Sequence, residues 1–304
     1  MAVIDAEFGK RTPSIAPQVR TYLACFPLRP KRVLHAIARV SSSSAVIAFR
    51  IFGPTNIKAE IMTTPFAVRE LVLSRNEVRN ALDLATTEQL IQSIAEARDD
   101  PGVRAVLLRG EGAGFCAGSD VKEMAQASMS ERLRIAERKA QLMRALAELD
   151  KPVICAVHGF ALGGGFMLAI GCDAVVTATD AVWRLPEVGL GFFPPWGIEA
   201  LVRRVGIARA RWLVWGATQL SGSEALRLGL AEVEAPAEKL LDEARALAIR
   251  LAELPAESIR ATKRFFREQV PVPGLDALAR EVYRENCEAG SAQAAFARFT
   301  SKAD

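Results

Sequence analysis

The sequence predicts an α/β fold in which most strands run parallel. From residue 67 onward, short apolar runs typical of strands alternate with longer segments of helical periodicity. Two glycine-rich loops join such strands to the helical segments that follow them. Half of the 304 residues are hydrophobic and 24% are charged, a composition that can bury a sizeable core. Strands that alternate with helices favour a parallel sheet covered by those helices.

The first predicted strand is the short apolar run of residues 67–74. Leucine and isoleucine at helical spacing predict a helix over residues 82–98, and the turn-forming sequence of residues 99–102 ends it. Residues 103–109 predict the second strand. A glycine-rich loop follows this strand and extends to Asp120.

The second half of the predicted sheet follows a charged amphipathic helix over residues 130–149. Residues 152–158 form a continuous apolar run, which is typical of a buried parallel strand. The triple glycine of residues 163–165 opens the next helix. Residues 174–179 predict a further strand, and several helices are expected after Gly197.

The charge distribution indicates a separate N-terminal segment. Residues 1–60 contain nine basic and three acidic residues, whereas the rest of the chain contains 30 basic and 32 acidic residues. We therefore expect a basic extension over residues 1–61, a core over 62–250 and a helical region over 251–304. The extension is interpreted as a poorly ordered segment, a targeting peptide or a mis-started reading frame, with a structured domain as the alternative.

Composition also limits the location and the cofactors. The five cysteines form no C-x-x-C pair, which favours a reducing compartment. We expect a cytoplasmic protein, or one of the mitochondrial matrix or another organelle if residues 1–60 are a targeting peptide. The two histidines, His35 and His158, are far apart in sequence, so no metal site is expected. The apolar stretch from Ala161 to Cys172 has 12 residues, too few to span a bilayer.

The two glycine loops are candidates for binding an anion. Glycine lets the backbone approach a ligand, and the amides at a helix N-terminus are free donors. A dinucleotide fingerprint fails in both loops, because Phe115 and Leu168 stand where it requires glycine. A phosphate-loop lysine and a G-x-S-x-G nucleophile around Ser119 are also absent. The loops therefore suit a phosphate or an oxyanion that develops during a reaction.

Six ordered motifs resemble those of the crotonase superfamily, the enoyl-CoA hydratase/isomerase family. They are R-x-E-x-x-N-A-L at residues 75–82, V-R-A-V-L-L-R-G-x-G-x-x-F-C-A-G-S-D at 103–120, K-P-V-I-C-A-V-H-G-F-A-L-G-G-G at 151–165, C-D at 172–173, L-P-E-V-G-L-G at 185–191 and A-L-R-L-G-L at 225–230. The resemblance covers about residues 69–270. It implies a spiral of β-β-α repeats and a C-terminal helical region that packs into trimers, often paired into hexamers.

The resemblance also implies an acyl-CoA substrate and no metal or redox cofactor, since CoA is part of the substrate. The thioester carbonyl would lie between the backbone amides of Ser119 and Gly164, which would stabilise an enolate oxyanion. The residues carried over as candidates for CoA binding are Ala117, Gly118, Asp120 and Lys122.

One departure from the family pattern bears on the reaction. Hydratases of this family carry one glutamate two residues after the triple glycine and a second one twenty residues later. Here the first position is Met167 and the second is Glu187. A thioether cannot transfer a proton, so the resemblance favours the family's Δ3,Δ2-enoyl-CoA isomerases, which use a single glutamate. An acyl-CoA hydrolase and an enoyl-CoA hydratase remain alternatives.

The expected acyl pocket is apolar, which would raise the pKa of Glu187. Its predicted residues are Met167, Phe166, Trp183, Phe192, Phe193 and Trp196. The bulky run that begins at Phe192 replaces a glycine-rich turn of the family, and it either narrows this pocket or packs in the core. Glu199 is a candidate for a displaced second carboxylate, although its place at a helix start favours a capping role.

Two rival classes of protein share some of these sequence features. A basic helix could bind RNA, as in some members of this superfamily, and here five basic residues share one predicted helix: Arg132, Arg134, Arg138, Lys139 and Arg144. Acidic neighbours and the absence of interleaved aromatic residues favour a solvated face instead, so we do not expect nucleic-acid binding. The second rival is a non-catalytic family member in which Met167 marks a decayed site.

Overall fold

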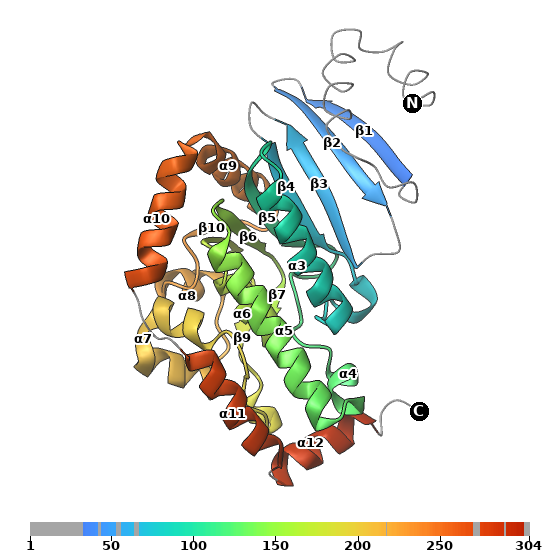
Figure 1. Ribbon diagram of the computed structural model, residues 1–304, viewed down its shortest axis with the longest axis vertical. Helices are drawn as coiled ribbons and strands as arrows, with labels where there is room; N and C mark the ends of the chain where they lie inside the picture. The colour runs from blue at the N-terminus through green and yellow to red at the C-terminus, as the bar shows by residue number, and fades with distance from the viewer. Residues whose placement is uncertain are drawn as a thin grey trace. The chain divides into compact units, whose positions relative to one another are not determined.

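The computed structural model describes residues 33–41, 44–52, 56–63, 67–216, 218–269, 274–288 and 290–300. The chain divides into two compact units, Met1–Leu34 and His35–Asp304. Apart from the first two residues of β1, the described elements belong to the second unit, and the following description concerns that unit (Figure 1).

One eight-stranded sheet organises the fold, with the strand order β1-β2-β3-β4-β5-β6-β8-β10. The strands are β1 (Val33–Ser41), β2 (Ser44–Phe52), β3 (Ile57–Thr63), β4 (Ala67–Leu73), β5 (Val103–Gly110), β6 (Val153–Val157), β8 (Ala174–Ala178) and β10 (Val233–Ala235). From β4 to β10 each neighbouring pair is parallel, whereas β2, β3 and β4 pair antiparallel. The predicted α/β class with mainly parallel strands is therefore confirmed.

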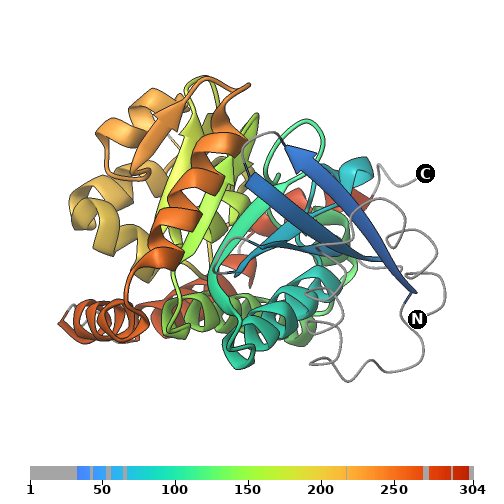
Figure 2. The ribbon, with the colours of Figure 1, turned by 90° about the horizontal axis from the view of Figure 1, so that it is seen from above.

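Helices cover the parallel part of the sheet, which explains its apolar strands. The helices are α3 (Leu84–Asp99), α4 (Val121–Gln126), α5 (Met129–Glu148), α6 (Gly164–Ile170), α7 (Ile198–Val214), α8 (Gly222–Arg227), α9 (Leu240–Glu253), α10 (Ala256–Gln269), α11 (Leu275–Glu288) and α12 (Gly290–Thr300). Helix α3 packs against α5, and α9 packs on β5 and β6 (Figure 2). Every residue of β4 and β6 is buried, as a parallel sheet covered on both faces requires.

The predicted boundary at residue 62 falls inside the sheet and needs correction. Strand β3 begins at Ile57 and pairs with β4 along its whole length. Its sequence alternates apolar and charged residues, which is typical of an antiparallel strand with one solvated face. The charge count of residues 1–60 alone does not distinguish this strand from the basic extension. Residues 1–32, on which the targeting and mis-start interpretations largely rest, lie outside the described residues.

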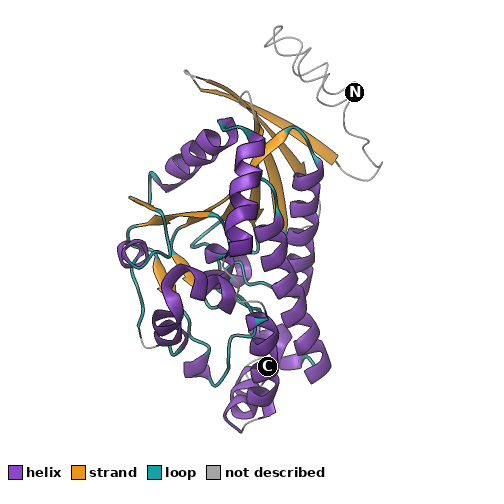
Figure 3. Ribbon diagram, turned by 60° about the vertical axis from the view of Figure 1, so that its left-hand side comes forward, coloured by secondary structure: helices purple, strands orange, loops and turns teal. Residues whose placement is uncertain are grey.

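The predicted helical region after residue 250 is present as α10, α11 and α12 (Figure 1). Figure 3 shows helices around the C-terminal end of the chain. Its assembly into trimers stays a prediction. None of the helices in the described part of the chain is both long enough and apolar enough to cross a membrane.

Candidate active site

The first glycine loop brings Ser119 to the N-terminus of α4. Gly118 has a φ of +103°, a conformation that favours glycine. The backbone on either side of Ser119 is fixed, because Gly118 accepts a hydrogen bond from the amide of Leu82 and the amide of Asp120 donates to the carbonyl of Leu82. Among the described residues, the amide of Ser119 itself has no acceptor.

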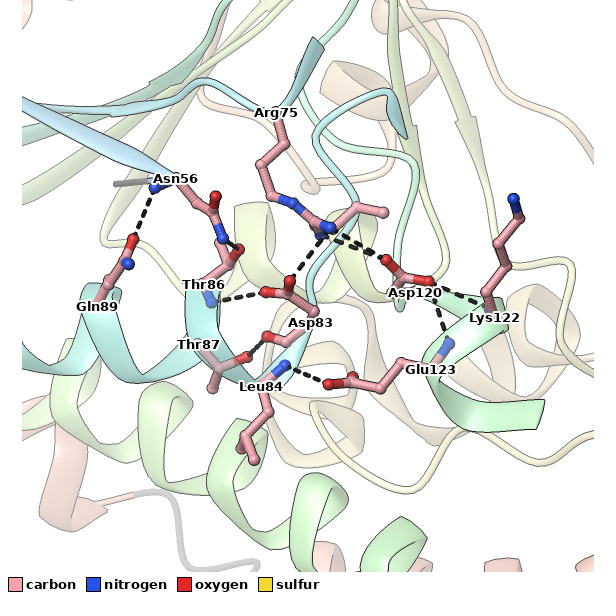
Figure 4. A network of polar contacts seen from close by, with 11 residues as sticks. Asn56, Arg75, Asp83, Leu84, Thr86, Thr87, Gln89, Asp120, Lys122 and Glu123 are labelled. Atoms are coloured by element: carbon pink, nitrogen blue, oxygen red, sulfur yellow. Dashed lines mark hydrogen bonds and ion pairs between the residues drawn. The ribbon is translucent and has the colours of Figure 1, made fainter. Parts of the chain in front are cut away.

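A half-buried ion network holds this loop in place (Figure 4). Arg75 lies 3.1 Å from a carboxylate oxygen of Asp83 and 3.3 Å from one of Asp120. Asp120 also caps α4, because its other oxygen accepts hydrogen bonds from the amides of Lys122 and Glu123. Asp83 caps α3 by accepting from the amide of Thr86. Arg75 therefore ties the starts of two helices together next to Ser119.

The second glycine loop brings Gly164 close to Ser119. Gly163 has a φ of +50° and its amide donates to the carbonyl of Arg184 in β9 (Val182–Arg184). Gly164 is the first residue of α6, where an amide has no partner within the helix. A Cβ atom at Gly164 would lie only 3.2 Å from the amide nitrogen of Ser119. The two amides that the resemblance assigns to the oxyanion are thus neighbours, and neither donates to another described residue.

Glu187 lies beside this pair of amides, at the start of a short 3-10 helix, η2 (Val188–Leu190). A Cβ atom at Gly163 would come within 2.6 Å of the Oε1 atom of Glu187. The residue as a whole is half-buried, but its Oε2 atom is fully buried and has no hydrogen-bond partner among the described residues. Burial raises the pKa of Glu187 to about 7.

The surroundings of Glu187 differ from those of another buried carboxylate, Glu70. Burial opposes ionisation of Glu70 too, but hydrogen bonds and charge from Arg245 and Arg109 outweigh it and hold its pKa below the usual value. Glu187 receives no such pair of guanidinium groups. A carboxylate with a raised pKa inside a pocket is typical of a general acid or base.

A cavity of about 150 Å³ opens in front of Glu187 and the two amides. Its wall is mostly apolar, and Glu187 is the one carboxylate among the described residues that line it. The predicted residues found on this wall are Ala117, Gly118, Ser119, Gly164, Met167, Glu187, Phe192, Phe193 and Trp196. The structure therefore brings most of the predicted site residues together.

Two predicted pocket residues do not lie on this wall. Phe166 and Trp183 are buried and pack edge to face, with ring centroids 5.3 Å apart. The indole nitrogen of Trp183 donates to the hydroxyl of Thr177. Their assignment to the pocket needs correction, because they belong to the core beneath it.

Three further candidates also lie outside the cavity wall. Asp120 belongs to the network of Arg75, and the side chain of Lys122 is exposed at the start of α4. Their roles in CoA binding stay predictions. Glu199 forms an ion pair with Arg203, and it is Asp276 of α11 that caps the start of α7. Glu199 is therefore neither a second carboxylate of the cavity nor the helix cap.

The C-terminal helices complete the cavity with residues that the motifs did not indicate. Tyr283 of α11 and Phe296 of α12 line its wall, and the ring of Phe296 lies 4.7 Å from that of Phe192. The side-chain oxygen of Asn286 accepts a hydrogen bond from the amide of Phe193. These residues lie about 90 or more positions after the bulky loop, so no local pattern could have placed them here.

Lys139 is the charged residue that the sequence interpretation missed. We expected the basic residues of this helix to form a solvated face, but the side chain of Lys139 is only 1% exposed and lines the cavity. It stands four residues after the buried Ile135 and four before the buried Met143. Residues with this spacing share one face of a helix, so the helical periodicity of the sequence indicates that Lys139 is buried.

Comparisons with known proteins agree with this geometry. The sequence model of the family described as enoyl-CoA hydratase/isomerase matches residues 63–297. The human protein named enoyl-CoA hydratase domain-containing protein 2, mitochondrial, is 37% identical over 206 residues, which cover 67% of this chain and 68% of that protein. The short-chain-enoyl-CoA hydratase of Clostridium acetobutylicum is 34% identical over 198 residues, covering 64% and 76%.

Solved structures resemble the fold over most of its length. The crystal structure of an enoyl-CoA hydratase/isomerase from Mycobacterium paratuberculosis has a TM-score of 0.72 and 25% identity, covering 81% of this chain and 98% of that one. The enoyl-CoA hydratase of Bacillus anthracis has a TM-score of 0.67 and 28% identity, covering 82% and 97%. The expected crotonase-like fold is confirmed by these neighbours.

Proposed function

The chain belongs to the enoyl-CoA hydratase/isomerase family, and on that basis we propose that it is a Δ3,Δ2-enoyl-CoA isomerase with Glu187 as its single catalytic acid and base. The observation that carries this proposal is the composition of the cavity wall. Glu187 is the one carboxylate among its described residues, and Met167 stands where the hydratases of the family have a second glutamate.

The proposed reaction moves one proton within the acyl chain. The thioester carbonyl accepts hydrogen bonds from the amides of Ser119 and Gly164. Glu187 removes a proton from C2 of a 3-enoyl thioester, and the electron pair of that C–H bond passes into a dienolate whose negative charge lies on the carbonyl oxygen. The same carboxyl group returns the proton to C4, so the double bond shifts from C3=C4 to C2=C3. Fixed amides favour the dienolate over the substrate, because its oxygen carries more charge.

The pKa of Glu187 supports its role in both steps. A group with a pKa of about 7 is ionised often enough to remove a proton at neutral pH and is acidic enough to return it. The Oε2 atom has no hydrogen-bond partner among the described residues, so no bond within that part of the protein competes for its lone pairs.

Hydration is the second candidate, because the names of the relatives point to it. Both relatives compared above are named as hydratases or hydratase-domain proteins. Hydration needs one group to activate water and another to handle the proton at C2. Met167 can do neither, so a hydratase here would depend on Glu187 alone.

The test is product analysis with both substrate types. Purified protein is given 3-hexenoyl-CoA and 2-hexenoyl-CoA, and products are identified by mass and by the position of the double bond. An isomerase converts the first to 2-hexenoyl-CoA without a change in mass. Dominant formation of 3-hydroxyhexanoyl-CoA from 2-hexenoyl-CoA, with no shift of the double bond, would instead assign a hydratase. Release of free CoA would assign a hydrolase.

A further inference from the structure

The ammonium group of Lys139 is buried at the cavity without a partner. Its helix, α5, contributes three residues to the wall, of which Ile135 and Ala136 are apolar. Among the described residues, no atom accepts a hydrogen bond from Nζ of Lys139. Leaving a buried charge unpaired costs several kcal/mol, so buried lysines normally have a partner.

Most carboxylate oxygens near Lys139 already accept hydrogen bonds from, or form ion pairs with, other groups (Figure 4). Asp83 and Asp120 both bind Arg75, and Oε1 of Glu123 accepts from the amide of Leu84. The Oε2 atom of Glu123 is buried without a hydrogen-bond partner as well, and the charge of Glu123 is the largest of those that favour the ammonium form of Lys139. The local structure therefore concentrates negative charge around Lys139 without satisfying its hydrogen-bonding capacity.

These carboxylates keep the lysine charged. Burial lowers the pKa of Lys139 to about 8, and the charges of Glu123, Asp120 and Asp83 oppose that shift. At neutral pH the side chain is thus mostly an ammonium ion. The pKa of Glu187, in contrast, is raised by burial, with no charged neighbour contributing. The charge of Lys139 therefore does not contribute to the raised pKa of Glu187.

Another buried basic residue of the same helix, Arg132, differs from Lys139 because groups of the protein satisfy its charge. Arg132 is also buried, but it donates to the carbonyls of Met124 and Ala125 and stacks 3.5 Å over the ring of Phe296. Two of its guanidinium nitrogens and the face of the group thus have partners. Lys139 has no such arrangement, and its unpaired Nζ atom is buried in the wall of the cavity.

This inference rests on the proposed function. We propose that Lys139 is a specificity residue that binds a carboxylate carried on the acyl chain. The substrates are then monothioesters of unsaturated dicarboxylic acids. An acyl chain held at the two amides and at Glu187 would extend along the apolar wall toward α5. A carboxylate on that chain would supply the acceptor that Lys139 lacks.

A binding experiment with saturated thioesters tests this without any turnover. Hexanoyl-CoA, the monothioester hexanedioyl-CoA and the methyl ester of the latter differ in the charge at the far end of the chain. We expect the wild type to bind hexanedioyl-CoA at least tenfold more tightly than the other two, because a charge-assisted hydrogen bond forms in a dry site. In Lys139→Met this preference should fall to less than threefold.

The matched control is Lys239→Met, which removes an exposed lysine at the start of α9 and should keep the preference. Equal binding of the three thioesters by the wild type would overturn the inference, as would a preference that persists in Lys139→Met. The methyl ester keeps the test decisive if the Lys139 variant fails to fold, because it removes the charge from the ligand instead.

Turnover separates this inference from the proposed function. If 3-hexenoyl-CoA and 3-hexenedioyl-CoA both remain unisomerised while hexanedioyl-CoA still binds preferentially, the isomerase proposal fails and the role of Lys139 stands. If both substrates are isomerised with equal kcat/KM and the saturated thioesters bind equally well, the isomerase proposal stands and the role of Lys139 fails.

Discussion

The carboxylate of Glu187 lies directly against the backbone of Gly163, so closely that a methyl group at residue 163 would approach its Oε1 atom to 2.6 Å. Gly164, the next residue, presents the amide proposed for the oxyanion. The carboxylate of Glu187 therefore contacts the residue that directly precedes the oxyanion donor. The second glycine loop sets the position of the two groups relative to each other. This contact explains why the triple glycine and the P-E motif, more than twenty residues apart, act as a single unit.

Replacing Glu187 by glutamine should abolish isomerisation of 3-hexenoyl-CoA. An amide has almost the same shape but cannot accept the C2 proton, and general acid–base groups contribute about 10²–10⁴ in rate. The measurement is kcat with the double-bond position followed by mass spectrometry of derivatised product. Binding of hexanoyl-CoA by the same variant serves as the control for an intact pocket. Activity within tenfold of wild type would contradict the role of Glu187.

The rate of the wild type should rise with pH and then level off. Glu187 must be ionised to remove a proton, and its pKa is about 7. Below that value kcat/KM for 3-hexenoyl-CoA should fall about tenfold per pH unit, and above pH 8 it should stay constant. A profile measured from pH 5 to pH 9 that shows no inflection near 7 would argue against a desolvated carboxylate as the base.

Side chain and backbone at the oxyanion site should respond differently to substitution. Ser119→Ala keeps the amide and should change kcat less than threefold. Gly164→Ala places a Cβ atom 3.2 Å from the amide nitrogen of Ser119 and 2.8 Å from the ring of Trp196, where it obstructs the space between the donors. Loss of an oxyanion donor costs about 10²–10³ in rate, so we expect at least that loss in kcat. Comparable effects of the two changes would mean that the hydroxyl of Ser119 takes part.

Much of the site could be predicted because its parts are local. Each glycine loop joins a strand to a helix, and such a junction exposes amides whatever the rest of the chain does. Met167 and Glu187 follow from their positions within the same motifs. The structure confirms that these segments meet around one cavity, while their catalytic roles stay predictions.

What the sequence interpretation missed depends on long-range packing. Phe166 and Met167 are adjacent on α6, and successive helical residues point about 100° apart. Met167 therefore faces the cavity while Phe166 packs on Trp183. The direction of Lys139 was missed for a related reason, because charge was given more weight than helical spacing. Strand β3 was missed because its charged face resembles the basic segment before it.

Introducing the second carboxylate should create hydratase activity. Met167→Glu restores the residue that hydratases of the family carry two positions after the triple glycine, beside the same cavity as Glu187. With two carboxylates, one can activate water while the other handles the C2 proton. We expect the rate of 3-hydroxyhexanoyl-CoA formation from 2-hexenoyl-CoA to rise at least tenfold above wild type. Met167→Gln is the matched control, since it adds polarity without a base.

Wild type that already hydrates 2-hexenoyl-CoA as fast as it isomerises 3-hexenoyl-CoA would overturn the reading of Met167. The variant buries a new carboxylate, so its urea unfolding should be compared with that of Met167→Gln to separate a loss of folding from a lack of activity.

The pH dependence of the unfolding free energy provides an independent measure of how far folding raises the pKa of Glu187. Its pKa is about 7 in the folded protein and 4.5 in the absence of burial. As pH rises from 4.5 to 7 the unfolded chain loses the proton while the folded protein keeps it, so wild type loses stability across this window. The full loss, on the order of 3 kcal/mol, is reached above pH 7. Glu187→Gln has no such proton and escapes the loss.

We therefore expect Glu187→Gln to be more stable than wild type, with a difference in unfolding free energy that grows between pH 5.5 and pH 8.5. Urea unfolding at the two pH values measures it. Glu70→Gln is the matched buried control: its carboxylate is held ionised by Arg245 and Arg109, so this variant should be less stable than wild type at both values. A Glu187→Gln variant that is destabilised equally at both pH values would mean that the carboxylate is satisfied in the folded state, and its raised pKa, on which the single-base mechanism depends, would have to be abandoned.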